Sequence, residues 1–188
     1  MLFRSATGSI GRAVTELLAL QHPKALILIG RTPAHLAELE NVIKARISKT
    51  DLIISTDIAQ IQSADIVIVA TASPEVLIRP EYLKQQAIIY DVSQPQNISP
   101  DIAQKRPDVL VIDGGLVSTP GINYHFNFGC PKEVAFACLA ETMLLAAQNT
   151  SEGYSIGAVD FGKIDRITQI ARNYHFTNFF LRHKPVKI

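Results

Sequence analysis

The 188-residue sequence has few cysteines, little net charge and no long apolar run. Its two cysteines lie eight positions apart, which predicts cytosolic thiols rather than a disulfide framework. The formal net charge is +1 and no basic run stands out, which argues against binding to nucleic acid or to an anionic membrane. The longest apolar runs, such as Ala25–Gly30, are too short to span a bilayer, so no stable membrane insertion is expected.

Two more absences narrow the classes of protein. The five histidines and two cysteines show no zinc-binding spacing, so no metal site is predicted. Met1–Arg4 runs directly into a glycine motif and shows no cleavable signal, from which a cytoplasmic location is expected. Apolar residues make up 47% of the chain and charged residues 19%, which is typical of a globular domain with a buried core.

Short apolar segments alternate with helical patterns along the first two thirds of the chain. The segments expected to be strands are Ala25–Gly30, Asp51–Ser55, Ile66–Ala70, Ala87–Val92 and Val109–Asp113. Such alternation predicts an α/β fold with a Rossmann-type, doubly wound parallel sheet. Ligands bind at the carboxyl ends of such strands, so the loops at Gly8, Arg31, Thr71, Ser93 and Gly114 should gather on one edge. Gly114 and Gly115 are expected to end the last of these strands.

The two ends of the chain give further expectations. Only Met1–Arg4 is available for the strand that precedes the glycine motif, where about five residues are usual. We therefore expect a truncated first strand and a fragment of a longer enzyme. Near the other end, Pro131–Ala147 and Phe161–Tyr174 read as helices. Residues 1–150, with the cysteine-bearing helix, are predicted to form the nucleotide-binding domain, and residues 151–188 its carboxyl-terminal helical extension.

The glycine motif and the residues after the next strands predict a site for NADPH. Glycines at a helix start let the backbone approach a pyrophosphate, although Ser5 replaces the usual first glycine and a plain helix start is the alternative. Arg31 stands where an NAD-specific site usually has an acidic residue, and its guanidinium suits a 2′-phosphate; the alternative is a solvated loop charge. The predicted cofactor-binding residues are Thr7, Gly8, Ser9, Ile10, Gly11, Arg31, Thr32, Ala70, Ser73, Gly114 and Gly115.

The two cysteines are candidate nucleophiles, because a thiol can carry an acyl group as a thioester. Cys130 precedes Pro131 at the expected start of a helix, where the helix dipole would lower the pKa of its thiol. Cys138 would lie two turns further along this apolar helix, where cysteine is usually a small buried hydrophobe. Helix physics alone therefore favours Cys130.

Several stretches occur in the order found in a known family. These are Ala6–Gly11, Arg31, Val69–Ser73, Asp91 with Pro95, Gly114–Val117 and, most specifically, Phe136–Glu141 with Met143–Leu145. In these stretches the chain resembles the carboxyl-terminal reductase domain of the long-chain acyl-(acyl-carrier-protein) reductases, the aldehyde-forming enzymes of cyanobacterial type. It also resembles a broader group of shikimate-dehydrogenase-like proteins and predicted amino-acid dehydrogenases.

The resemblance implies an NADPH-dependent oxidoreductase that reduces a fatty acyl thioester to an aldehyde. It assigns the acyl-carrying nucleophile to Cys138 and so reverses the order that helix physics gives. The implied partner is a fatty acyl thioester, on acyl-carrier protein or coenzyme A. The family's amino-terminal region, which helps to hold the acyl chain, has no counterpart in this sequence. The apolar helix leaves a homo-oligomer open, since it could pack against a second subunit.

Two other functions stay open at this point. One is a shikimate-dehydrogenase-like NADP oxidoreductase that acts on a hydroxyl or amino acid, and the other is a non-catalytic nucleotide-binding module. Asp91 and Asp113 end strands at the expected ligand edge and would either contact ribose or cap loops. Glu141, His125 and His175 have no evident catalytic partner, so packing or surface roles are favoured for them.

Overall fold

The computed structural model describes residues 2–4, 6–47, 49–71, 73, 75–127, 129–150, 153–154 and 159–182. The chain divides into two compact units, of which unit 1 comprises Met1–Asp113 and Arg182–Ile188 and unit 2 spans Gly114–Leu181. The expected domain boundary lay later, after residue 150. The helix that bears Cys138 therefore belongs to unit 2 rather than to the nucleotide-binding unit.

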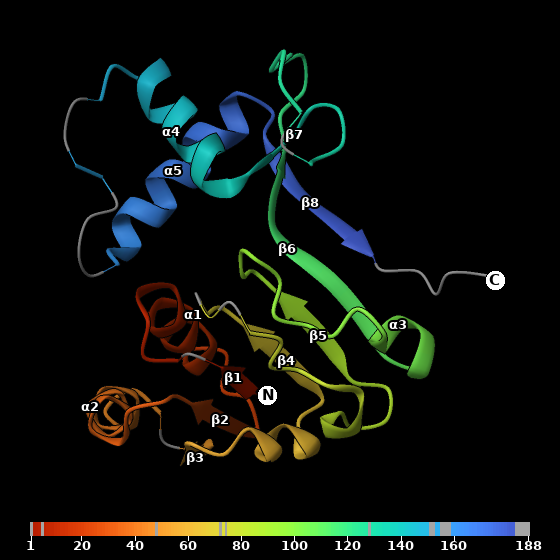
Figure 1. Cartoon of the computed structure of the whole chain (residues 1–188). Helices are drawn as coiled ribbons and strands as arrows, with labels where there is room; N and C mark the ends of the chain where they lie inside the picture. The colour runs from red at the N-terminus through yellow and green to blue at the C-terminus, as the bar shows by residue number, and fades with distance from the viewer. Residues whose placement is uncertain are drawn as a thin grey trace. The chain divides into compact units, whose positions relative to one another are not determined.

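Unit 1 is built on a parallel sheet (Figure 1). Its strands are β1 (Leu2–Arg4), β2 (Ala25–Ile29), β3 (Asp51–Ser55), β4 (Ile66–Val69), β5 (Ile88–Asp91) and the first half of β6 (Leu110–Ser118). The spatial order β3-β2-β1-β4-β5-β6 is that of a Rossmann sheet, which confirms the predicted fold class. The three residues of β1 form a central strand of this sheet. Each of them pairs with one residue of β2 and one residue of β4.

Both faces of this sheet are covered. Leu26 and Leu28 of β2 pack in a cluster with α1 (Ser9–Ala19) and α2 (Pro33–Lys44). The alternate residues Ile27 and Ile29 pack in a second cluster. That cluster includes residues from the short helices η1 (Ile58–Ser63) and α3 (Ile102–Lys105) and from the segment around η2 (Pro80–Tyr82). Because side chains alternate across a strand, a strand buried on both faces is apolar throughout, as β2 is.

The carboxyl ends of the strands lie in register. Arg4 pairs with Ile29 on one side and with Val69 on the other, and Val69 pairs in turn with Asp91. Asp91 then pairs with Asp113. The loops that follow β1, β2, β4 and β5 therefore start from one edge of the sheet, as expected from the sequence.

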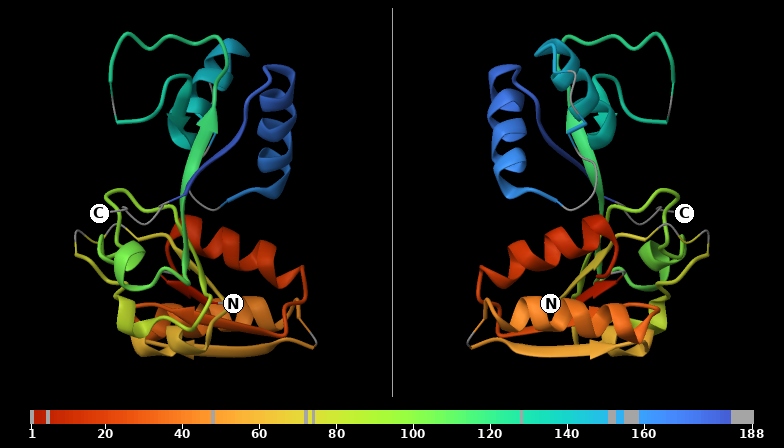
Figure 2. Two further views of the ribbon diagram at one scale, coloured as in Figure 1. Left: turned by 90° about the vertical axis from the view of Figure 1, so that its right-hand side faces the viewer. Right: turned by 90° about the vertical axis from the view of Figure 1, so that its left-hand side faces the viewer.

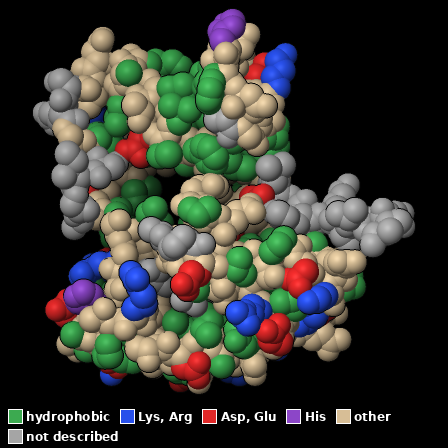
Figure 3. Space-filling model, in the orientation of Figure 1, with side chains coloured by type: hydrophobic (Ala, Val, Ile, Leu, Met, Phe, Trp, Pro, Cys, Tyr) green, Lys and Arg blue, Asp and Glu red, His purple; other side chains and the backbone are tan. Residues whose placement is uncertain are grey.

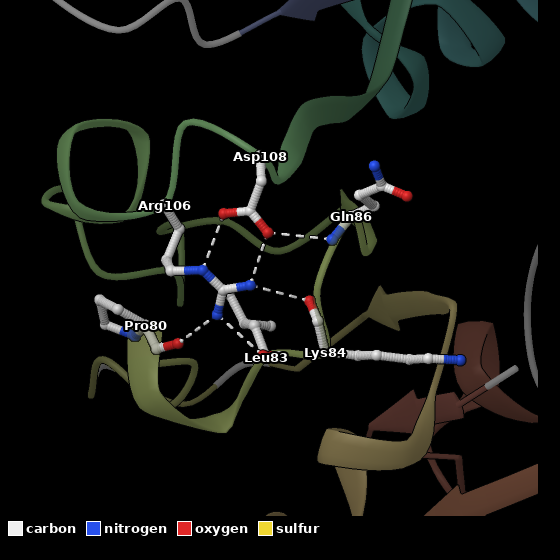
Figure 4. A network of polar contacts seen from close by, with 6 residues as sticks. All are labelled: Pro80, Leu83, Lys84, Gln86, Arg106 and Asp108. Atoms are coloured by element: carbon white, nitrogen blue, oxygen red, sulfur yellow. Dashed lines mark hydrogen bonds and ion pairs between the residues drawn. The ribbon is translucent and has the colours of Figure 1, made fainter.

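An arginine clamp ties loops together at the opposite edge, before β5 and β6 (Figure 4). The guanidinium of Arg106 donates to the carboxylate of Asp108 at 2.8 and 2.7 Å. It also donates to three backbone carbonyl oxygens, those of Pro80, Leu83 and Lys84, at 2.8–3.0 Å. Asp108 in turn accepts from the backbone N–H of Gln86 at 3.0 Å. This network belongs to the scaffold, because ligands bind at the other edge of such sheets.

Unit 2 differs from the sequence expectation in several elements. The strand expected to end at Gly114 continues through Gly115 to Ser118, where β6 pairs with the antiparallel strand β7 (Val134–Phe136). The helix expected over Pro131–Ala147 is in fact β7 followed by α4 (Ala137–Ala147). Glu133 has a positive φ of 57°, which breaks the helical pattern, and pairing with β6 takes up the backbone of Val134–Phe136.

The rest of unit 2 is α5 (Phe161–Asn173) and β8 (Thr177–Arg182), which pairs with β6. The helix predicted over Phe161–Tyr174 is thereby confirmed. The two helices α4 and α5 lie side by side (Figure 2) and share a small core of Ala140, Leu144, Ile170 and Phe176. Among the helices of the described ranges, none is long and apolar enough to cross a bilayer.

The two units also differ in the surface that they show in one view. Figure 3 shows Lys and Arg side chains interspersed with Asp and Glu on the visible face of unit 1. On the visible face of unit 2, hydrophobic side chains gather instead. Exposed apolar residues of unit 2 include Leu139, Val159 and Phe126, of which Phe126 is 74% exposed.

Candidate functional site

The glycine loop joins β1 to α1 at the carboxyl edge of the sheet. Ala6 donates its backbone N–H to the carbonyl of Ile29 at 3.1 Å, which ties the loop to the end of β2. Gly8 is the N-cap of α1, and no side chain caps the helix there. The first helical hydrogen bond runs from Arg12 to the carbonyl of Gly8 at 2.7 Å. Helix geometry therefore leaves the amides of residues 9–11 without helical acceptors, as a bound phosphate requires.

The predicted loop residues differ in exposure. Gly8, Ser9 and Ile10 are exposed, Thr7 is partly buried, and Gly11 is buried inside α1. Burial of Gly11 fits the role of a glycine that lets a helix pack closely on its sheet. Ser5, which replaces the usual first glycine, lies outside the described residues.

A glycine at the end of β2 brings the loop and α2 close together. A Cβ atom at Gly30 would lie 3.1 Å from Cδ2 of Leu36 in α2 and 3.4 Å from Cγ2 of Thr7 in the glycine loop. A larger residue here would crowd the Leu36 side chain. The sequence analysis counted Gly30 only as the end of a strand and missed this packing role.

Arg31 follows Gly30 directly and is exposed. Within the part of the chain that the structure describes, no acidic side chain forms an ion pair with Arg31. Thr32 is the N-cap of α2 and Pro33 is its first residue, but the Thr32 side chain makes no capping hydrogen bond. The guanidinium and this hydroxyl are thus both placed at the carboxyl edge, where a 2′-phosphate would lie in a Rossmann site.

The loops after β4 and β5 are joined by side-chain hydrogen bonds. Thr71 donates its backbone N–H to Oγ of Ser93 at 3.1 Å, and Ser73 donates its own to Oγ1 of Thr71 at 3.2 Å. Asn97 donates from Nδ2 to the carbonyl oxygen of Ser73 at 2.6 Å. Ala70 and Ser73, two of the predicted cofactor-binding residues, are partly buried at this edge. Ala72 and Pro74 lie outside the described residues.

Asp91 organises this pair of loops. Its two carboxylate oxygens accept the backbone N–H groups of Ser93 at 2.9 Å and Asn97 at 3.1 Å, and only 3% of the residue is exposed. Burial raises the pKa of the Asp91 carboxyl and the nearby charge of Asp113 acts in the same direction, whereas the bonds from Ser93 and Asn97 oppose the rise. Of the two roles left open for Asp91, the structure shows loop capping.

Asn97 also lies at the carboxyl edge of the sheet, although it was not predicted there from the sequence. It is fully buried, and its Nδ2 group also donates to the carbonyl oxygen of Glu75 at 2.8 Å. Its Oδ1 atom has no hydrogen-bond partner among the described residues. Asp113, also predicted at this edge, accepts from Nε2 of Gln96 at 2.7 Å. The segment 94–97 therefore supports the ligand edge through side chains that no periodic pattern marks.

The remaining predicted residues lie in unit 2. Gly114 and Gly115 are part of β6 rather than of a loop, and Gly115 has a positive φ of 71°. His125 and His175 are exposed and also have positive φ values. The described residues hold no group of three or more His, Cys, Asp or Glu side chains that could bind a metal ion.

The structure corrects the physical comparison of the two cysteines. Cys130 lies in a bend, seven residues before α4, so it is not at a helix start. It is partly buried, and burial raises the pKa of its thiol, whereas the sequence analysis expected a lowered pKa. Cys138 is the second residue of α4 rather than a residue two turns inside a helix, and it is exposed. Cys138 therefore takes the place in the first helical turn that the sequence analysis gave to Cys130.

Comparison with known proteins places the matched family on unit 1. The family model described as "Shikimate / quinate 5-dehydrogenase" matches residues 6–113. A long-chain acyl-[acyl-carrier-protein] reductase of Synechococcus elongatus is 28% identical over 160 residues, which is 81% of this chain and 44% of that protein. The aminotransferase PigE of a Serratia strain is 33% identical over 95 residues, which is 47% of this chain and 11% of that protein. The chain thus spans less than half the length of either curated relative.

Solved structures also resemble the chain. The malate dehydrogenase of Plasmodium falciparum in complex with NADH has a TM-score of 0.45 and 14% identity, over 92% of this chain and 67% of that one. The lactate dehydrogenase of Eimeria maxima with NADH and oxamate has a TM-score of 0.39 and 14% identity, over 61% of this chain and 43% of that one.

Proposed function

We propose that this chain, which belongs to the shikimate/quinate 5-dehydrogenase family, is an NADPH-dependent reductase that converts a fatty acyl thioester to an aldehyde. The family and the Rossmann-type unit 1 support the coarser statement, an NAD(P)-dependent oxidoreductase. The finer proposal depends on Cys138. The observation that carries it is the exposed position of this thiol in the first turn of α4, inside the segment that resembles the aldehyde-forming reductases.

The residues of unit 1 fit a dinucleotide phosphate. The uncapped start of α1 offers backbone N–H groups to a pyrophosphate. Arg31 and Thr32 stand after β2 and would contact a 2′-phosphate, for which the guanidinium has the matching fork of donors. Arg31 is exposed and forms no ion pair with an acidic side chain among the described residues, which favours NADPH over NADH.

In the proposed reaction the Cys138 thiolate attacks the acyl carbonyl of the thioester. The carbonyl's bond to the carrier sulfur breaks, and the carrier leaves as a thiolate that takes a proton from water. When bound, NADPH supplies the hydride that reduces the acyl group on the enzyme. The resulting hemithioacetal anion then expels the Cys138 thiolate and releases the aldehyde. Acyl-carrier protein is the proposed acyl donor.

The test is an NADPH-dependent aldehyde assay with a long-chain acyl thioester, in which the wild type is compared with Cys138→Ser and Cys130→Ser. We expect Cys138→Ser to abolish aldehyde formation, because a hydroxyl is a far weaker nucleophile at this position. Cys130→Ser is the matched control and should retain the activity, since Cys130 is partly buried and lies seven residues before α4 in the sequence. Equal aldehyde formation by all three proteins would reject the covalent step.

The description of the matched family favours a second candidate function for the chain. In this reading the chain transfers hydride between NADP(H) and a hydroxyl or amino acid without a covalent intermediate. Such an enzyme would keep its activity after alkylation of Cys138, whereas the proposed acyl reductase would lose it. Turnover of a hydroxy acid by the alkylated protein would establish this second candidate.

A further inference from the structure

Unit 2 contains a cavity of about 490 Å³ whose lining comes from α4, α5 and the strands β6 and β8. Its size lies in the range of small-molecule ligand sites. The apolar part of the lining consists of Val117, Ala137, Ala140, Leu144, Ile167, Ala171 and Phe176. The alanines of α4 and α5 contribute only small side chains to this lining.

The cavity lies beside the first turn of α4. Ala137, the residue before Cys138, and Glu141, three residues after it, both line the cavity. Since successive residues are rotated by about 100° around a helix, Cys138 lies about 60° from Glu141, on the flank of the lining face. An exposed thiol thus stands next to an apolar cavity on the same helix.

We propose that this cavity binds the acyl chain of the substrate while the acyl carbonyl is held at the Cys138 thiol. The inference rests on the proposed function for the identity of the ligand, and it adds the place where the chain is bound. An acyl chain matches the aliphatic and aromatic wall, because transfer of methylene groups from water into such a wall is favourable. Thr168 and Arg172 of α5 also line the cavity, so one part of its lining is polar.

The first experiment measures binding without cofactor or turnover. Dodecanoic acid is titrated against a fluorescent fatty acid bound to the 188-residue protein, and the alkylation rates of both cysteines are followed by mass spectrometry. We expect the fatty acid to displace the probe and to slow alkylation of Cys138 but not of Cys130, which serves as an internal control. Absence of displacement, or equal alkylation rates with and without the fatty acid, would overturn the proposal.

The second experiment narrows the cavity. Ala171→Leu places a larger side chain in the wall of the cavity. If this variant does not fold, Ala137→Leu enlarges the wall at a second position. Each is expected to weaken dodecanoic acid binding about tenfold, since each displaced methylene contact removes a sizeable part of the transfer free energy. Ala146→Leu is the matched control, because Ala146 is exposed on α4 and does not line the cavity. Circular dichroism confirms the fold of each variant.

The outcomes separate this inference from the proposed function. Fatty acid binding with selective protection of Cys138, but no aldehyde formation, would support the acyl cavity and contradict the reductase. Aldehyde formation that responds equally to Ala171→Leu and Ala146→Leu for every chain length would support the reductase and contradict the acyl cavity.

Discussion

Arg31 and the two cysteines show how far the surroundings of single residues can be predicted from the sequence. Arg31 could be placed from the sequence, because it follows Gly30 at the end of an apolar run that forms the buried strand β2. The cysteines could not, because their environment depends on where α4 begins. Nothing in the apolar run Val134–Phe136 distinguishes a strand from a helix, so the sequence analysis put Cys130 at the helix start. Cys138 was selected as the nucleophile by the resemblance to the aldehyde-forming reductases and not by local helix physics.

Replacement of Arg31 tests the preference for NADPH at this scale. We expect Arg31→Ala to weaken NADPH binding about 10- to 100-fold, the usual effect of losing charged hydrogen bonds to a phosphate. NADH lacks the 2′-phosphate, so its affinity should stay nearly the same. Titration of cofactor fluorescence measures both constants, and an equal loss for the two cofactors would mean that Arg31 does not contact the 2′-phosphate.

At the scale of elements, the sequence predicts the parallel strands well and the irregular connections poorly. The strands β2 to β5 are short apolar runs with clear ends, and α2 has an N-cap residue and a proline at its start. The missed elements are β7, β8 and the short helices η1, η2 and α3, whose formation depends on distant partners rather than on local periodicity. The loop network around Asp91 and Asn97 was missed for the same reason.

The arginine clamp before β5 and β6 gives a pH-dependent stability. Hydrogen bonds from Arg106 and from the backbone of Gln86 hold the pKa of Asp108 well below its usual range. A carboxyl group with a lowered pKa stabilises the fold above its unfolded pKa of about 3.9 and loses this effect as the pH falls toward the folded pKa. Asp108→Asn should therefore lower the Tm at pH 7, and the difference from wild type should narrow below about pH 4.

Thermal unfolding followed by circular dichroism at several pH values checks this prediction. Asp51→Asn is the control, because Asp51 is exposed on the edge strand β3 and belongs to no described ion pair. A difference in Tm between Asp108→Asn and wild type that stays constant down to pH 3 would contradict an ionic role for Asp108.

At the scale of the whole molecule, the chain divides within one strand, since β6 begins in unit 1 and ends in unit 2. The sequence predicts the fold of unit 1 but not the boundary between the two units. Apart from two glycines, no turn or loop residue within β6 marks this boundary. The two units also have unequal cores. Unit 1 has a large buried cluster on each face of its sheet, whereas unit 2 has a cluster of four buried residues between its helices.

The larger core of unit 1 predicts slower hydrogen exchange of its backbone amides than of those in unit 2. The backbone amides of β2 and β4 should exchange most slowly, because the residues on both sides of these strands are buried. The amides of α4 and α5 should exchange faster, since opening of these helices breaks fewer buried contacts. Exchange followed by mass spectrometry measures both regions in one protein, and equal protection of the two units would contradict the prediction.

The central claim is that Cys138 carries the acyl group, and intact-mass spectrometry tests it most directly. The protein is mixed with a long-chain acyl thioester in the absence of NADPH, and the acylated peptide is located by digestion. If Cys138 carries the acyl group, one acyl group is added to the peptide that contains Cys138 and is released as aldehyde when NADPH is added. An acyl group on Cys130, or none on either cysteine in a protein that still forms aldehyde, would contradict it.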